Sequence, residues 1–311
     1  MSGGLDSQLA IKVLERAGAD VEAVCFSSPF FDTTGAVRTA EALGVKLHTL
    51  DFTDDILALL EAPAHGFGGA MNPCIDCHAA MIRRAGMLME ELGYDFIATG
   101  EVQGQRPMSQ NRQALGVVEK TSGLKGRLVR PLSAKLLEPT IPETQGLLDR
   151  EKLLDISGRG RERQIALAAE FGIKEYPSPA GGCKLTEEGF CRKLKDLKDH
   201  EGLGNRELVE LLSMARRFRL PGGTGVILGR DRGENAVLKD LGRLGTVVSP
   251  VNVPGPTALL PEVKSEDDFS LACELVAAYS RYDRLEGNIR LNVGEVDRPY
   301  DRSKFKDFQI C

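Results

Sequence analysis

The sequence predicts an α/β protein: a parallel sheet with helices on both faces, followed by a small C-terminal α+β domain. Apolar residues repeat at helical spacing in segments such as 6–17 and 78–92, and strand-like runs such as 21–26 and 46–50 lie between the helical segments. Such alternation of strands and helices is typical of parallel sheets covered by helices. The chain has 311 residues, 42% of them hydrophobic and none of them Trp, so it is long enough for about two domains with mainly aliphatic cores.

Composition changes along the chain predict three regions. Residues 1–172 carry the alternating pattern, residues 173–215 hold a Gly/Pro-rich loop and two helices, and residues 216–311 form a new unit. The strand-like runs 225–229 and 244–248 place a second, smaller sheet in that last region.

Charge and cysteine content narrow the class of protein. The net charge is −5, yet residues 151–250 are mildly basic, which permits contact with nucleic acid without requiring it. The arginines at 216, 217 and 219 are each expected to be solvated surface charges. Without a long apolar run or a signal peptide, we expect a cytoplasmic protein with no membrane contact. The odd number of cysteines, seven, favours metal, cluster or redox use over a disulfide framework.

The chain opens with a candidate phosphate loop, Ser2-Gly3-Gly4-Leu5-Asp6-Ser7, directly before a helix. Two glycines let the backbone approach an anion, and the helix start offers unpaired N–H groups and a positive dipole end. The hydroxyls of Ser2 and Ser7 add donors, so the segment suits a pyrophosphate. Its spacing differs from that of the common GxxxxGK[ST] loop. The alternative is a glycine-rich start in which Asp6 or Ser7 merely caps the helix.

Three cysteines form the second candidate site. Cys74 and Cys77 make a CxxC before the helix at 78–92, where the helix dipole favours thiolates. Alone, this pair could be a redox pair, half a zinc site, part of a cluster site or simple packing. Cys183 is flanked by glycines that leave its sulfur accessible. Three cysteines with an open position suit a [4Fe–4S] cluster, and the same three could serve persulfide chemistry with Cys77 and Cys183 as the working pair.

The opening SGGLDS resembles the signature of the PP-loop ATP pyrophosphatase superfamily. The resemblance implies an adenine nucleotide alpha hydrolase-like fold and adenylation of a carbonyl oxygen with release of pyrophosphate. In that superfamily a buried strand precedes the loop, whereas here only Met1 does.

Further segments resemble tRNA thiouridylases of this superfamily. NPCIDC (72–77) is similar to the NP-x-x-x-C segment of bacterial 2-thiouridylases and to the CxxC of cluster-bearing PP-loop thiolases. Segments 99–110, 130–143 and 178–186 resemble a thiouridylase family related to ThiI and MnmA. The region from about 216 resembles the RNA-binding domain of NFACT proteins.

The resemblance implies ATP-dependent tRNA thiolation, with ATP and Mg²⁺ as cofactors and either a [4Fe–4S] cluster or a cysteine persulfide as the sulfur carrier. It implies tRNA and a sulfur donor (sulfide or a cysteine desulfurase) as partners. The oligomeric state stays open, with a homodimer among the alternatives. The catalytic residues would be Cys77, Cys183 and Asp6, and the cluster ligands Cys74, Cys77 and Cys183.

Residues for the nucleotide and the substrate follow from the phosphate loop and the strand ends, where parallel sheets bind ligands. The nucleotide-binding candidates are Ser2, Gly3, Gly4, Asp6, Ser7, Phe26, Ser27, Thr99 and Gly100. The candidates for the uridine or its phosphates are Gln105, Arg106, Ser109, Arg159 and Arg161. Against these, Phe26 could be a core residue, the 105–110 segment an exposed loop, and the arginines solvated charges.

Two other functions fit parts of the sequence. A PP-loop amide ligase or small-molecule sulfur transferase would need neither the basic middle region nor an RNA-binding tail. A non-catalytic RNA-binding module with structural zinc and a degenerate ATP loop would form no AMP.

Overall fold

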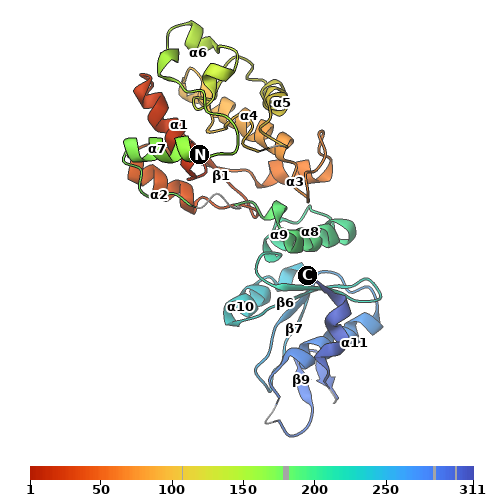
Figure 1. Cartoon of the computed structure of the whole chain (residues 1–311). Coiled ribbons are helices and arrows are strands. Elements are labelled where there is room, and N and C mark those ends of the chain that lie inside the picture. The colour runs from red at the N-terminus through yellow and green to blue at the C-terminus, as the bar shows by residue number, and fades with distance from the viewer. Residues whose placement is uncertain (107, 178–181, 283–284, 298–299) are drawn as a thin grey trace. The chain divides into compact units, whose positions relative to one another are not determined.

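The computed structural model describes residues 1–106, 108–177, 182–282, 285–297 and 300–311. The chain divides into two compact units, Met1–Thr186 and Glu187–Cys311, each with a hydrophobic core of its own (Figure 1). The division predicted from the sequence, at residues 172 and 215, stays a prediction. Across the described ranges, none of the helices has both the length and the apolar character needed to cross a bilayer.

The first unit, red to green in Figure 1, alternates helices and strands along the chain. Its elements are α1 (Leu5–Arg16), β1 (Ala23–Ser27), α2 (Thr34–Leu43), β2 (Leu47–Asp51), α3 (Thr53–Glu61), α4 (Cys74–Leu92), β3 (Ile97–Ala98), α5 (Arg112–Ser122), β4 (Leu128–Val129), α6 (Ile141–Thr144) and α7 (Glu162–Glu170). Glycines with positive φ follow α2, α4 and α5, at Gly44, Gly93 and Gly123. This left-handed conformation ends a helix at little cost only for glycine.

The strands of the first unit pair in parallel. β1 runs beside β2, with Cys25 opposite Thr49, and β3 runs beside β4, with Ile97 opposite Leu128. The mixed α/β fold is therefore confirmed. The described strands form two separate pairs, however, and β3 and β4 contribute only two residues each. The hydrogen bonds therefore do not define one continuous parallel sheet with helices on both faces.

The core of the first unit gathers around α1. Leu5, Leu9 and Val13 recur every four residues, so they lie on one face of the helix and are buried. They share a cluster with Val129 of β4 and Leu132 just after it. This packing fixes the start of α1, and with it the candidate phosphate loop, against the region where β4 ends.

The second unit, green to blue in Figure 1, is built on an antiparallel sheet in the order β11-β5-β6-β8-β7. Its elements are α8 (Glu188–His200), α9 (Arg206–Leu211), β5 (Arg216–Arg219), β6 (Gly225–Leu228), α10 (Arg232–Asp240), β7 (Thr246–Val248), β8 (Ala258–Leu260), α11 (Glu266–Tyr279), β9 (Ile289–Leu291), β10 (Gly294–Val296) and β11 (Gln309–Ile310). Leu275 and Val276 of α11 join Phe218, Leu228 and Leu260 of the sheet in the core.

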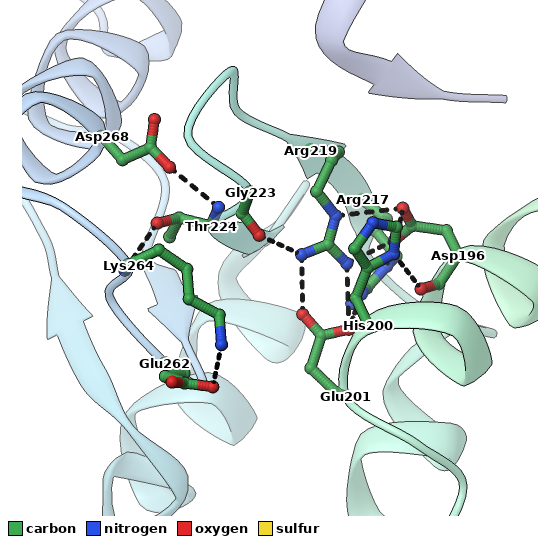
Figure 2. A network of polar contacts seen from close by, with 10 residues as sticks. All are labelled: Asp196, His200, Glu201, Arg217, Arg219, Gly223, Thr224, Glu262, Lys264 and Asp268. Atoms are coloured by element: carbon green, nitrogen blue, oxygen red, sulfur yellow. Dashed lines mark hydrogen bonds and ion pairs between the residues drawn. The ribbon is translucent and has the colours of Figure 1, made fainter.

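A buried ionic cluster fastens α8 to β5 in the second unit (Figure 2). Arg217 is 1% exposed and donates to both Asp196 and Glu201, and Arg219 donates to the same two carboxylates at 2.8 to 3.0 Å. We name Asp196, Glu201, Arg217 and Arg219 the α8–β5 cluster. The expectation of solvated arginines is wrong for Arg217 and Arg219, whose side chains are 1% and 13% exposed, because Asp196 of α8 and Glu201 just after it bind both guanidinium groups.

Candidate active site

The phosphate loop is held in a shape that only glycine permits. Gly3 has a φ of +77°, and a Cβ added there would lie 2.5 Å from the carbonyl carbon of Gly35. Gly4 is the N-cap of α1, and its carbonyl accepts from the Ser7 hydroxyl at 2.8 Å. The exposed Ser2 hydroxyl accepts from the Gly4 N–H at 3.3 Å. The loop therefore lies close to the start of α2 and presents the first turn of α1.

The end of β3 lies directly against this loop. A Cβ added at Gly100 would lie 2.7 Å from the Asp6 carbonyl carbon and 2.8 Å from the Ser7 nitrogen. Thr99, just before it, donates its N–H to the Val129 carbonyl at 3.0 Å and so extends the β3–β4 pair. The predicted strand end and the predicted phosphate loop are thus in backbone contact.

A polar segment after β3 reaches the same loop. The Gln105 side chain donates to the Asp6 carboxylate at 3.1 Å, while the other Asp6 oxygen, Oδ1, is buried without a hydrogen-bond partner among the described residues. The Gly158 N–H donates to the Gln103 carbonyl at 2.8 Å, which brings the segment that carries Arg159 and Arg161 alongside.

The substrate candidates on these segments differ in exposure. Arg106 and Arg159 are exposed, and Arg161 is half-buried with its Nε enclosed and unpartnered among the described residues. Ser109 is 5% exposed, so it lies inside the segment rather than on its surface. Their contacts with a substrate stay a prediction.

The CxxC begins α4. Cys74 is the first residue of the helix, and its sulfur accepts from the Asn72 amide at 3.1 Å. Cys77 is one turn further on. Between them, Asp76 is buried and accepts from both the backbone N–H and the Nδ1 of His65, at 2.9 and 2.7 Å. These contacts tie the loop before α4 to its first turn.

Cys183 lies near this pair, although it is more than a hundred residues away in the sequence. Burial raises the pKa of the Cys77 thiol above its ordinary value, and the nearby groups of Cys183, Cys74 and Asp76 act in the same direction. The Cys183 segment is anchored by Lys184, whose N–H donates to the Phe30 carbonyl at 3.0 Å. Residues 178–181 of the thiouridylase-like segment lie outside the described residues.

The three cysteines do not form a ligand set as they stand. Within the part of the chain that the structure describes, no group of three or more His, Cys, Asp or Glu side chains is arranged to hold a metal ion. Cysteines 74, 77 and 183 are neighbours, yet they do not stand as a metal-binding group among the described residues. The predicted cluster is therefore not supported.

Phe26 and Ser27, at the end of β1, contact the core-facing Phe52. The Phe26 and Phe52 rings lie edge to face with centroids 5.4 Å apart, and the Ser27 carbonyl accepts from the Phe52 N–H at 2.9 Å. This packing accounts for Phe26 without a ligand, so its contact with adenine stays a prediction.

Sequence reasoning missed the polar group that joins the two candidate sites. Glu101 accepts from His78 of α4 at 3.1 Å and from Arg130 at 2.9 Å. Both Glu101 and Arg130 are buried. The one available signal was the position of Glu101 directly after Thr99-Gly100. Its partners could not be identified because they lie 23 and 29 residues away in the sequence.

Comparisons with known proteins match both parts of the chain. Residues 215–309 match the family model described as NFACT protein RNA binding domain. The chain is 27% identical over 259 residues to the tRNA-specific 2-thiouridylase MnmA of Xanthobacter autotrophicus and 31% identical over 254 residues to that of Marinobacter nauticus. Each alignment covers 75% of this chain but only 59% and 57% of the respective relative. The chain thus spans less than three fifths of their length.

Among solved structures, the C-terminal part of the fibronectin/fibrinogen-binding protein from Streptococcus suis matches at 15% identity with a TM-score of 0.24, covering 83% of this chain and 89% of that one. A score this low supports no inference. The two sequence matches confirm the predicted resemblance to PP-loop tRNA thiouridylases and to the NFACT-type RNA-binding domain.

Proposed function

We propose that the chain is an ATP-dependent tRNA thiouridylase that adenylates a uridine carbonyl oxygen and replaces that oxygen with sulfur. One observation carries the proposal. The phosphate loop, the end of β3, the CxxC helix and Cys183 all belong to the first unit. The close approach of Gly100 to the loop and the hydrogen bond of Glu101 to His78 connect the loop to the CxxC helix. The similarity to proteins named tRNA-specific 2-thiouridylase supports the same reaction.

The phosphate loop would bind the ATP phosphates. Backbone N–H groups at the start of α1 and the hydroxyls of Ser2 and Ser7 are donors suited to a pyrophosphate. The uridine oxygen attacks the α-phosphorus, pyrophosphate leaves, and the base carries AMP on that oxygen. Mg²⁺ would neutralise phosphate charge, and the Asp6 carboxylate, with one oxygen unpartnered among the described residues, is the group suited to hold it.

Sulfur transfer is assigned to Cys183 and Cys77. A cysteine desulfurase would transfer sulfane sulfur to the Cys183 thiolate, giving a persulfide. Its outer sulfur attacks the activated carbon, and AMP leaves with the oxygen. The Cys77 thiol, whose pKa is raised, then gives up its proton as its sulfur attacks that of Cys183; the thiouridine sulfur leaves, and a Cys77–Cys183 disulfide remains for a dithiol to reduce. No step is assigned to an iron–sulfur cluster, because no metal-binding group is found among the described residues.

The second unit would supply RNA binding. Residues 215–309 match an RNA-binding family, which favours an RNA substrate over a small molecule. The alternative of a PP-loop enzyme for a small molecule predicts pyrophosphate release that RNA does not stimulate.

The purified full chain with ATP, Mg²⁺, unmodified tRNA and a desulfurase with cysteine tests the proposal. We expect tRNA-stimulated pyrophosphate release and a thiouridine detected by mass spectrometry of digested tRNA. Cys77→Ala and Cys183→Ala should abolish thiouridine formation and retain pyrophosphate release. Cys273 belongs to the other unit, so Cys273→Ala should change neither activity. Pyrophosphate release indifferent to tRNA, with no thiouridine formed, would contradict the proposal.

A further inference from the structure

Glu101 occupies a junction between the two halves of the candidate site. Its neighbour Gly100 lies so close to the phosphate loop that no Cβ fits between that residue and the Asp6 backbone. The Glu101 side chain reaches the other way, to His78 in the first turns of α4, and His78 directly follows Cys77 in the sequence. Two adjacent residues therefore contact the loop on one side and the cysteine helix on the other.

Both oxygens of the Glu101 carboxylate are committed. Oε1 accepts from His78 Nδ1 at 3.1 Å, and Oε2 accepts from Arg130 Nε at 2.9 Å and from the Thr99 hydroxyl at 3.1 Å. Arg130 is fixed in turn by the Glu119 carboxylate and the Leu115 carbonyl of α5, at 3.2 and 3.0 Å. The carboxylate is thus held on three sides and has little freedom to turn.

The carboxylate is also ionised. Burial alone would raise the pKa of Glu101, but the hydrogen bond from His78 and the positive charge of Arg130 outweigh burial and hold that pKa at about 2. A buried charge with strong, directional hydrogen bonds fixes geometry better than an exposed pair does.

We propose that Glu101 and His78 are positioning residues, and that their hydrogen bond holds Cys77 in register with the phosphate loop. The proposal rests on the function proposed above, because register matters for passing sulfur to a base activated at that loop. A misplacement of about 1 Å can cost about a hundredfold in rate.

Two substitutions at His78 separate positioning from other roles. Asn places an amide nitrogen where His carries Nδ1, so His78→Asn keeps the donor to Glu101 and removes the imidazole. His78→Leu removes the donor. A positioning role predicts that Leu is damaging and that Asn restores function. A proton-transfer role for the imidazole predicts that both are damaging.

The measurements are the rates of tRNA-dependent pyrophosphate release and of thiouridine formation. We expect His78→Leu to lower thiouridine formation by about tenfold or more and to leave pyrophosphate release within about threefold of wild type. His78→Asn should stay within about threefold of wild type in both rates. Glu143→Gln is the control for disturbing a buried ion pair elsewhere in the same unit, because the Glu143 carboxylate is buried and paired with Arg150.

A third measurement does not depend on the proposed function. The rate of Cys77–Cys183 disulfide formation with diamide, followed by mass spectrometry, reports how well the two sulfurs meet. It should fall in His78→Leu, recover in His78→Asn and stay unchanged in Glu143→Gln. If wild type makes no thiouridine, the proposed function fails while this measurement still tests positioning. Equal disulfide rates in Leu, Asn and wild type, or equal damage by Leu and Asn, would overturn the inference.

Discussion

The buried ionic groups of the two units differ in what they join. In the first unit, Glu101 and Arg130 connect the end of β3 to α4 and α5, beside the phosphate loop and the CxxC. In the second unit, the α8–β5 cluster connects a helix to a strand, and all four of its residues belong to that unit. Both networks pair a buried arginine with carboxylates. Burial of a charge therefore does not by itself identify a functional group, whereas the segments that the charged pair connects do.

Removing one buried arginine from each network should have the largest effect on stability. Arg130→Met and Arg217→Met each remove two hydrogen bonds from a guanidinium to carboxylates, which should lower the unfolding free energy of the unit concerned by about 3–5 kcal/mol although His78 and Arg219 remain as partners. Hydrogen exchange measured by mass spectrometry on peptides of both units localises the loss. Arg217→Met should leave the protection of phosphate-loop peptides as in wild type, and loss of that protection would remove the contrast between the networks.

The stability of the wild type should depend on acidic pH more strongly than that of Glu101→Gln, which replaces the carboxylate by a neutral amide. The folded pKa of Glu101, about 2, lies below the ordinary value of 4.5, so its stabilisation is present above pH 4.5 and is lost as the pH falls toward 2. That difference corresponds to about 3 kcal/mol. Denaturant unfolding at intervals from pH 5 to pH 2 should therefore show a steeper loss of stability in wild type than in Glu101→Gln. Parallel curves would mean that the carboxylate is not ionised in the folded state.

Two glycines, one in each unit, compare a close contact with backbone and a close contact with a side chain. A Cβ at Gly100 would meet the Asp6 backbone at 2.7 Å, whereas the three atoms nearest to a Cβ at Gly222 belong to the Asp268 side chain and begin at 2.8 Å. Because backbone yields less than a side chain, Gly100→Ala should lower pyrophosphate release by about tenfold, and Gly222→Ala should leave it unchanged. A steady-state pyrophosphate assay compares them, and equal rates would show that the β3 contact does not shape the loop.

An exposed pair sets the lower limit of the comparison. Lys195 and Asp199 are one turn apart on α8, and the Lys195 Nζ lies 2.5 Å from the Asp199 Oδ2. The lysine side chain is mostly exposed. Lys195→Ala should change the unfolding free energy by less than about 0.5 kcal/mol, because water and salt screen such pairs. Thermal unfolding against wild type measures the difference, and a loss as large as that of Arg217→Met would contradict the distinction drawn from burial.

Local patterns carried most of what the sequence could predict. The phosphate loop and the CxxC are contiguous motifs, and the helices at 6–17 and 78–92 follow from apolar spacing. Predicting these features requires no knowledge of residues distant in the sequence. Glu101 was not recognised as a junction because its partners come from other elements. Arg217 was misjudged because the carboxylates that pair with it, Asp196 and Glu201, precede it by 21 and 16 residues. The predicted cluster is not supported by the described residues, and spacing along the sequence suggests ligands without fixing the distances among three sulfurs.

The α8–β5 cluster has a practical consequence for cutting the chain. The RNA-binding family match begins at residue 215, after Asp196 and Glu201 but before Arg217. A fragment that starts at that point would contain Arg217 but neither of the carboxylates that pair with it, and it would lack α8. Expression boundaries for the C-terminal half are therefore better drawn from residue 187, where the compact unit itself begins.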